Sequence, residues 1–474
     1  MTPRVLVYAL LLFMAAISLA QPKKSAAPPA VSPAAKICDD PYQVTGSADG
    51  WPEGPVYILY HRDKSKLPWA KNPAIRVPGL EAPTASAART LVCIEETLLE
   101  AGRYDSGAPA YSPSWDITLV RMSDRKVFFG RVGFYGKEPP GVKYHRGAGI
   151  GAAPVKLFTD WLSLVVGQKV ARLKMRISRK DLEMHEVSRL VFSADGSRLA
   201  VAQEPRSSLG GTPPSPVTVF NVATGNKVAS WHVDYLVGPM ALSASGTMVA
   251  LGRYGHPEVW DVASARLVHK LDTGKAESLL FGPNDALGVA GNYTLGSPSN
   301  EADAKAAAWD VTGERVIQSG AGARILLSPA GEWVTVGIAR SGVTVRTLNG
   351  ERLLATFPAI ADNDKLAIAG DLQSMAAGSL LNTRIAAAGA KPADQHSVSL
   401  PNLGVDMIYD FAPAPDGFVF ANSDGIVGVA SAASPQPRAF ATDLTAIHAV
   451  AVSRDGKLVA VGDSSGNVSV WDLL

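Results

Sequence analysis

The C-terminal part of the chain shows a pattern of apolar and polar residues that recurs through most of the sequence. Two apolar runs, 449–452 and 458–461, flank a turn at 454–456, and a third run at 468–471 follows a turn at 463–466. Apolar residues that alternate with polar ones between Asp-Gly and Ser-Gly turns are typical of short antiparallel strands joined by tight hairpins. We therefore predict three strands of one small antiparallel sheet here.

The same order of strands and turns occurs six more times upstream. The first turn of each copy lies at an equivalent position, and these positions are spaced by about 40 to 50 residues, the blade period of a β-propeller. Four copies are followed by residues that predict a fourth, outer strand, at 227–231, 266–271, 315–317 and 352–355. The equivalent turn positions are Asp195, Ser245, Asn284, Ala330, Gln373, Asp416 and Asp455.

The final copy has no fourth strand after it in the sequence. Residues 167–173, which precede the first copy, have the pattern of such a strand. We expect them to pair with the last copy and so to join the two ends of a ring. Closing a ring of sheets removes the open sheet edges that promote aggregation.

Three copies end in a Trp-Asp dipeptide, at Trp260-Asp261, Trp309-Asp310 and Trp471-Asp472. With these dipeptides at the end of the third strand, residues 167–474 resemble WD-repeat β-propellers. The Gly-His dipeptide with which that family begins its repeats is missing, since Gly255-His256 falls between a second and a third strand. The resemblance implies an all-β fold with a seven-bladed WD-like propeller, of the kind found in exported bacterial proteins that carry an extra N-terminal domain of unassigned role.

The first 36 residues have the features of an export signal and a linker. Residues 1–20 combine Arg4, an apolar run at 5–19 and small residues before position 21, which is typical of a signal peptide. The apolar run is shorter than the roughly 18 to 20 residues of a membrane span. Residues 21–36 are rich in Ala and Pro and predict a flexible linker. We expect an exported protein, periplasmic or secreted; the alternative is an uncleaved signal that acts as an anchor.

Residues 37–166 do not follow the repeat and predict a separate β-rich N-terminal domain. Strands are expected at 56–60, 90–95, 117–122 and 127–129, and a short helix is expected at 157–166. The chain has two cysteines, Cys38 and Cys93, and both lie in this domain. Because exported proteins seldom keep free thiols, we predict a structural disulfide between them.

The charge of the chain is unevenly distributed. Residues 37–180 carry a net charge of +7, whereas residues 181–474 carry −9, and the whole chain carries +2. The two parts could attract each other or meet partners of opposite sign, or the difference could be a drift in composition over solvated surfaces. An acidic propeller and an export signal both argue against nucleic acid as a partner.

The sequence contains no motif that points to catalysis. The eight histidines are scattered and lack metal-ligand spacing, and no nucleophile elbow or dinucleotide fingerprint occurs. We therefore expect no catalytic residues, no metal and no cofactor, and a protein that is not an enzyme. An alternative stays open, because propeller enzymes and small-ligand binders assemble their sites from several blades around the central channel.

The loops between second and third strands share one face of a propeller, and two of them, at 205–216 and 293–304, are enlarged. Enlarged loops on one face of a repeat array often mark its binding side. We therefore predict a protein-binding or scaffold function on this rim; membrane contact is expected only if the signal stays uncleaved, and the oligomeric state is left open. The candidate binding residues are Glu204, Arg253, Tyr254, His256, Asn292, Tyr293, Arg340, Asn422 and Asp463.

Overall fold

The fold is all-β, and most of its strands belong to four-stranded antiparallel sheets. The computed structural model describes residues 33–39, 51–62, 69–137, 149–166, 170–177, 181–183, 185–204, 214–234, 238–253, 256–271, 275–291, 305–311, 315–339, 341–359, 365–379, 382–398, 400, 408–442, 444 and 446–474. The predicted signal peptide and most of the linker lie outside these residues. Neither of the two described α-helices, of 7 and 12 residues, has the length and apolar character needed to cross a membrane.

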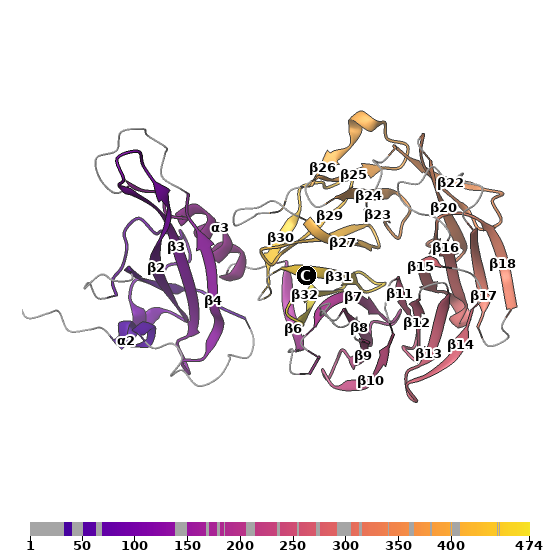
Figure 1. Cartoon of the computed structure of the whole chain (residues 1–474), viewed down its shortest axis with the longest axis horizontal. Coiled ribbons are helices and arrows are strands. Elements are labelled where there is room, and N and C mark those ends of the chain that lie inside the picture. Colours follow the sequence, from indigo (N-terminus) through magenta and orange to yellow (C-terminus); the bar gives the residue numbers. More distant parts are fainter. Residues whose placement is uncertain are drawn as a thin grey trace, which may run out of the picture.

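Seven four-stranded sheets occur among the described residues after position 170, and each contains one copy of the repeat. Figure 1 shows them following one another around a common centre, with the first strand of each sheet on the inside. The first strands of neighbouring sheets contact one another, for example β7 with β11 and β27 with β31. This arrangement is consistent with a β-propeller, and all seven predicted turn positions lie between a first and a second strand.

The strands of the first four sheets are β7 (Glu186–Phe192), β8 (Arg198–Glu204), β9 (Ser215–Asn221) and β10 (Lys227–Val233); β11 (Met240–Leu242), β12 (Met248–Gly252), β13 (Pro257–Asp261) and β14 (Arg266–Lys270); β15 (Ala276–Phe281), β16 (Leu287–Gly291), β17 (Lys305–Asp310) and β18 (Arg315–Ala321); β19 (Arg324–Leu327), β20 (Trp333–Ala339), β21 (Gly342–Thr347) and β22 (Leu353–Phe357). Those of the last three are β23 (Lys365–Ile368), β24 (Ser374–Ser379), β25 (Asn382–Ala387) and β26 (His396–Ser397); β27 (Ile408–Ala414), β28 (Gly417–Asn422), β29 (Ile426–Ala430) and β30 (Arg438–Ala441); β31 (Ile447–Val452), β32 (Leu458–Asp463), β33 (Val468–Leu473) and β6 (Ala171–Ile177). Short 3-10 helices η2 (Pro283–Asp285) and η4 (Pro392–Asp394) lie between strands.

The last sheet joins the two ends of the repeat array. Its outer strand is β6, which pairs antiparallel with β33 in a register that places Ile177 opposite Val468 and Ala171 opposite Leu473. Lys174 contacts Asp472 at 2.8 Å across this pair. The prediction that a strand before the first copy completes the last sheet is therefore confirmed, although the strand begins at Ala171 and extends beyond residue 173.

A repeated hydrogen-bond pattern explains why the first turn forms in four of the seven copies. In these sheets the turn begins with a serine whose hydroxyl accepts a backbone N–H, at 2.9 to 3.1 Å, from the residue at or just before the start of the second strand. Three residues further on, a glycine with φ between +70° and +80° closes the turn, a conformation that side chains with a Cβ rarely adopt. The serines are Ser193, Ser243, Ser328 and Ser453, and the glycines are Gly196, Gly246, Gly331 and Gly456.

The outer strands carry β-bulges at one equivalent position. Val228, Val268 and Ile317 are each skipped in the pairing with the third strand, and they are 40%, 47% and 56% exposed. A bulge bends an edge strand and interrupts its ladder, which hinders pairing with another chain. The repeated bulge therefore protects outer strands that expose apolar side chains from pairing with another chain.

The N-terminal unit is a five-stranded sheet with one helix against each face. Its strands are β1 (Val56–Arg62), β2 (Thr90–Arg103), β3 (Pro109–Arg121), β4 (Val127–Tyr135) and β5 (Gly149–Ile150), and β1 runs parallel to β2. Alternate residues of β2 face opposite sides: Leu91 packs with the helix α2 (Pro33–Asp39), and Val92 and Ile94 belong to the core formed with α3 (Val155–Val166). A short 3-10 helix, η1 (Ala85–Ala87), precedes β2. The predicted strands and the helix near 157–166 are confirmed here.

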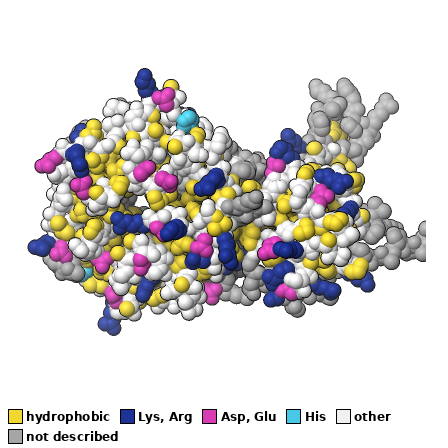
Figure 2. Space-filling view, turned by 180° about the vertical axis from the view of Figure 1, so that it is seen from behind, with side chains coloured by type: hydrophobic (Ala, Val, Ile, Leu, Met, Phe, Trp, Pro, Cys, Tyr) yellow, Lys and Arg dark blue, Asp and Glu magenta, His cyan; other side chains and the backbone are white. Residues whose placement is uncertain are grey.

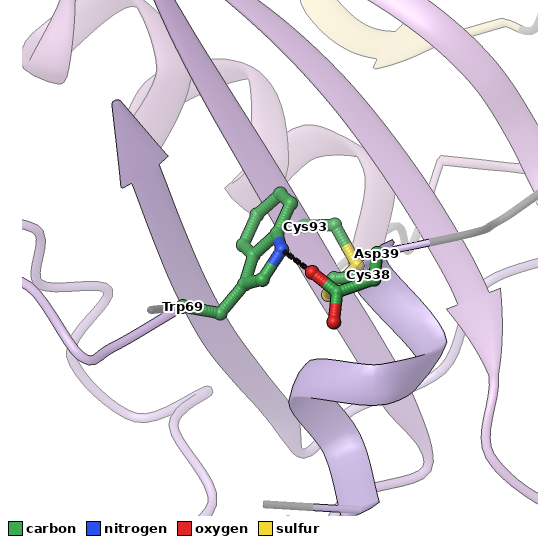
Figure 3. Close-up of a disulfide and its surroundings, with 4 residues drawn as sticks. All are labelled: Cys38, Asp39, Trp69 and Cys93. Carbon is green, nitrogen blue, oxygen red and sulfur yellow. Dashed lines mark hydrogen bonds between the residues drawn. A yellow bond between two sulfur atoms is a disulfide. The ribbon is translucent and has the colours of Figure 1, made fainter. Parts of the chain in front are cut away.

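The disulfide Cys38–Cys93 is present and ties α2 to β2 (Figure 3). Trp69 donates a hydrogen bond from Nε1 to Asp39 at 2.7 Å and fixes the end of the same helix. The expected linker at 21–36 is wrong at its end, since Pro33 begins α2. Ala34 and Ala35 are buried against the sheet, so their small side chains allow the helix to pack closely.

The N-terminal unit contacts the ring of sheets through α3, which lies against β30 (Figure 1). Trp51 joins the two parts, because its ring meets that of Trp471 edge-on at 4.7 Å and its Nε1 donates a hydrogen bond to the carbonyl oxygen of Val165 at 2.7 Å. One apolar cluster includes residues of α3 as well as residues of β27 to β30. The two parts therefore share a continuous core.

Candidate binding site at the centre of the sheet ring

Charged side chains from four sheets lie at one equivalent position of the inner strands. We define this position by the hydrogen bond that closes the hairpin between the first and second strands. In six of the sheets the residue that donates its backbone N–H to this bond lies four positions after it in the sequence. It holds Arg189, Arg324, Lys365 and Asp410 in the first, fourth, fifth and sixth sheets, and Pro239, Ser278 and Ala449 in the others. We call these seven residues the central layer.

Small residues of the second strands lie opposite most of the central layer. Arg189 pairs with Ala202, Lys365 with Gly378 and Asp410 with Ala421. Residues that pair directly across two strands lie on the same face of the sheet, so a small partner leaves room for the long side chain beside it. Arg189 and Lys365 are exposed, which shows that solvent reaches the layer.

Lys365 is the residue on which the contacts of the layer converge. Its ammonium group forms an ion pair with Asp410 and lies 5.2 Å from the ring centre of Phe411. Although 47% of the Lys365 side chain is exposed, the surrounding sheets partly desolvate its ammonium group, and this effect, together with the positive charges of Arg189 and Arg324, lowers the pKa of Lys365. Asp410 opposes this effect, since a neighbouring carboxylate favours the charged ammonium.

Asp410 is itself held in place by the next sheet. Its Oδ2 accepts a hydrogen bond from the backbone N–H of Val450 at 2.8 Å, while Oδ1 faces Lys365. Arg189 is held in a similar way, because its Nη1 donates to the carbonyl oxygen of Ser188 at 2.6 Å. These contacts fix the orientation of the Asp410 and Arg189 side chains.

A second cluster lies next to the central layer, on residues that form β-bulges in the inner strands. His448 is skipped in the pairing of β31 with β32, and Tyr409 is skipped in the pairing of β27 with β28. Their rings stack with centroids 5.1 Å apart. His448 Nδ1 lies 2.5 Å from Oε1 of Glu186 at the start of β7. A third bulge residue, Glu277, contacts Lys275 at 2.7 Å. Bulges re-aim side chains and are common next to functional sites.

The topology places both clusters at the end where the inner strands begin. In each sheet this end also carries the connection from the second to the third strand, so it is the face on which the binding rim was predicted. Glu204, one of the predicted residues, ends β8 on this face, is exposed and pairs in register with Glu186. The rim and the central layer therefore belong to one face of the molecule.

Two other predicted rim residues take part in a local network. Arg253 Nε lies 3.5 Å from Glu258, and His256 Nε2 lies 3.2 Å from the other oxygen of the same carboxylate. Trp260 Nε1 also donates a hydrogen bond to Glu258 at 3.2 Å. These side chains brace the turn before β13 around one nearly buried carboxylate.

Asn422 and Asp463 are buried and do not belong to an exposed rim. Asn422 Oδ1 accepts the backbone N–H of Asp424 and of Ile426, and Asp463 Oδ1 accepts those of Ser465 and Asn467. Both side chains therefore stabilise the turn that follows their own strand. Their placement in the exposed rim needs correction, and we do not retain them in the candidate site. Tyr254, Asn292, Tyr293 and Arg340 lie outside the described residues, as do most of the two enlarged loops.

No residue of the central layer is among the binding residues predicted from the sequence. Six of its members precede the predicted turn position of their copy by six residues, whereas Lys365 precedes Gln373 by eight. In single strands, however, an isolated Arg or Lys is typical of a solvated position. The layer becomes recognisable from the hydrogen bond that closes the hairpin, whose donor lies four residues after Lys365 at Ala369, as the donor does in five other copies.

Both signs of charge are scattered over the face drawn in Figure 2, with apolar side chains between them. Among the residues that the structure describes, no group of three or more His, Cys, Asp or Glu could hold a metal ion. A pocket of about 140 Å³ lies in the N-terminal unit, with an apolar lining that includes Val56, Ile58 and Ile75 and charged residues Lys71, Arg76 and Glu81 at its border. Its charges already contact neighbours, as Arg76 does with Glu81 at 3.3 Å.

The comparisons with known proteins do not assign a family. No protein-family model matches the chain, and no curated protein matches it either.

Proposed function

We propose that this chain is an exported, non-enzymatic binding protein built on a seven-bladed, WD-repeat-like β-propeller, with a β-rich N-terminal domain. Its ligand would bind on the face where the inner strands begin. The proposal rests mainly on one observation, the convergence of charged side chains from four sheets in the central layer. Seven sheets, a Trp-Asp dipeptide at the end of β13, β17 and β33, and ring closure by β6 support the propeller.

The disulfide supports export. Cys38 and Cys93 are joined and buried, and structural disulfides persist in oxidising compartments such as the periplasm or the outside of the cell. A signal peptide at 1–20 would provide the route. Fractionation of cells followed by N-terminal sequencing of the mature chain tests this part. A mature chain in the cytoplasm with an intact N-terminus would contradict it.

The central layer favours binding over catalysis in our proposal. Arginine side chains stay charged at any physiological pH, so Arg189 and Arg324 are suited to hold a ligand rather than to exchange protons with it. Between the two alternatives that the sequence left open, a small ligand at the central channel has more support than a protein scaffold at the rim. The reason is that the predicted rim residues Arg253 and His256 contact Glu258 instead of pointing a charge at a partner.

The test is a calorimetric and thermal-shift screen of the mature, oxidised protein against neutral, cationic and anionic small molecules. Hits are then titrated into the variant Arg189→Met/Lys365→Met and into the matched variant Arg266→Met/Lys270→Met on the exposed outer strand β14. Loss of binding only in the first variant supports the proposal. A ligand that binds both variants as it binds the native protein would place the site elsewhere.

A further inference from the structure

The outer edge of β1 in the N-terminal unit is paired at two places and open between them. Val56 exchanges both of its backbone hydrogen bonds with the segment 80–82, at 2.7 Å each, and Tyr60 exchanges both with Ala70, at 2.9 and 3.1 Å. Residues two apart in a strand present their backbone groups to the same edge, so Ile58 presents its N–H and C=O between these two pairs. Among the residues that the structure describes, no partner meets these two groups on that edge.

A local turn explains why the edge is open at Ile58. The carbonyl oxygen of Asn72 accepts the backbone N–H of Ile75 at 3.0 Å, and its side-chain Oδ1 accepts that of Ala74 at 3.0 Å. An Asn that bonds to the backbone two residues on is typical of such turns. The chain therefore leaves β1 after Ala70 and returns to it only at 80–82, and we call residues 71–79 between these points the arch.

The pocket of about 140 Å³ in the N-terminal unit lies between β1 and the arch. Its apolar lining includes Val56, Ile58, Ile75 and Ala82, and each of these residues is at most 8% exposed. An apolar cavity of about 150 Å³ is large enough to bind benzene. The pocket therefore has room for one small apolar group beside an unpaired backbone donor and acceptor. Buried backbone groups without a partner are rare in folded proteins, so this juxtaposition points to a ligand.

We propose that this pocket binds one amide-linked residue with a small apolar side chain. The side chain fills the pocket, while the N–H and C=O of the bound residue pair with the C=O and N–H of Ile58. This is strand addition reduced to a single residue, in which main-chain hydrogen bonds give affinity and the pocket selects the side chain. The site lies apart from the central layer and does not depend on the function proposed for it.

The neighbouring pairs limit the length of the ligand. Val56 and Tyr60 are already bonded to the segments at either end of the arch, so a bound chain cannot continue along β1 in either direction. This favours a capped amino acid or the end of a peptide over the middle of a strand. Charge has a small part in the recognition, because Arg76 and Glu81 at the border of the pocket contact each other at 3.3 Å.

The experiment is NMR spectroscopy of the mature, oxidised protein labelled with ¹⁵N-isoleucine and titrated with N-acetyl-valine N-methylamide. The signal of Ile58 is assigned by its loss in Ile58→Val. A ligand of this size binds at about millimolar concentration or tighter. We expect the amide proton of Ile58 to shift downfield, because it becomes hydrogen-bonded.

Two matched ligands test the two kinds of contact. An analogue with an ester oxygen in place of the N–H of the valine residue cannot donate to Ile58, and it should bind about two- to tenfold more weakly. The glycine analogue lacks the side chain and should bind about tenfold more weakly or worse. A longer peptide that ends in valine distinguishes the sources: tighter binding than that of the capped residue identifies a peptide end, and weaker binding identifies a small amide.

Two matched variants locate the site. Ala82→Leu fills the pocket and should weaken binding at least tenfold, whereas Ala87→Leu, on the exposed end of η1 and outside the lining, should bind as the native protein does. Thermal unfolding checks that both variants are folded. The variant Arg189→Met/Lys365→Met should also bind the probe unchanged, so this inference and the proposed function fail separately.

Three outcomes would overturn the inference. The signal of Ile58 does not move at roughly 10 mM of any probe, a very weak affinity; the ester and glycine analogues both bind as tightly as the valine probe; or Ala82→Leu binds as Ala87→Leu does. The first and second outcomes need no variant, so they are decisive even if Ala82→Leu does not fold.

Discussion

The disulfide allows a prediction whose magnitude follows from the chain itself. Cys38 and Cys93 are 55 residues apart, and the loop-closure relation for that length gives an entropy loss in the unfolded chain of about 14 cal/mol/K. At 25 °C this corresponds to about 4 kcal/mol, an upper value because unfolded chains keep some compactness. Reduction should therefore lower the free energy of unfolding of the N-terminal unit by up to about 4 kcal/mol.

The effect should be confined to the part of the molecule that the disulfide spans. Helix α2 has 7 residues and is attached through Ala34, Ala35 and Cys38, so without the bond it has little other apolar area to hold it. Hydrogen exchange measured by mass spectrometry in increasing urea reports the stability of α2 and β2 separately from that of the ring. Peptides from β9 and β21 serve as an internal control, since neither strand contacts the disulfide.

Oxidised and reduced protein of the same sequence are compared, so the packing of the two sulfur atoms changes little. The variant Cys38→Ala/Cys93→Ala should not respond to the reductant, which shows that the reductant acts through this bond alone. Unchanged protection of β2 after complete reduction would refute the argument. Equal loss of protection in the ring would refute the claim that the two parts differ in their dependence on the bond.

Two further predictions concern the ring. Trp471→Ala should lower the free energy of unfolding by about 3 to 5 kcal/mol in urea titrations, because the ring of Trp471 is fully buried where the two ends of the array meet. The matched variant Trp309→Ala should lower it by less, because Trp309 is only half-buried. Equal losses of stability in the two variants would contradict the role of closure. Asp455→Ala should cost about 1 kcal/mol at pH 7, because Ser453 Oγ donates to this carboxylate at 2.6 Å. Hydrogen bonding by Ser453 lowers the pKa of Asp455, so the contribution is complete above the unfolded value of about 3.9 and is lost as pH falls through the lower folded value. Urea titrations at pH 7 and below pH 3 check this, and a difference that does not shrink in acid would contradict it.

The repeat could be predicted from the sequence because its information is local. A serine, a glycine with positive φ and two alternating strands lie within one stretch of chain, so each hairpin is specified by its own residues. The pairing of β6 with β33 joins distant segments, yet it could also be predicted. The last copy has no outer strand after it, and residues before the first copy have the pattern of an outer strand.

Two of the predicted rim residues, Asn422 and Asp463, are buried, and turn chemistry explains why. Asn422 and Asp463 are each followed three residues later by a glycine, and an Asn or Asp in that setting often accepts hydrogen bonds from the backbone of its own turn. A polar residue at the end of a strand therefore need not face a ligand. Helix α2 was missed for a different reason, since the Ala-rich sequence at 33–36 becomes helical where the sheet and the disulfide hold it.

The fold constrains the residue type at the central layer less than it constrains the neighbouring position of each inner strand. The next residue along each inner strand is always apolar, and it is buried in six of the seven sheets, where it packs within and between sheets. These residues are Leu190, Met240, Leu279, Ile325, Leu366, Phe411 and Val450. The layer itself holds Arg, Pro, Ser, Arg, Lys, Asp and Ala, a range that no single packing role would permit.

A position that varies from charged to apolar between copies of one repeat contributes little to the shared core. Its side chains extend beyond small residues of the second strand, and changing them leaves the apolar layer beside them intact. The ring can therefore carry chemistry at this position without loss of stability, whereas the turn serines and glycines cannot change without weakening a hairpin. Because charged, polar and apolar residues all occur at this position in copies of one repeat, the fold itself does not require charge there.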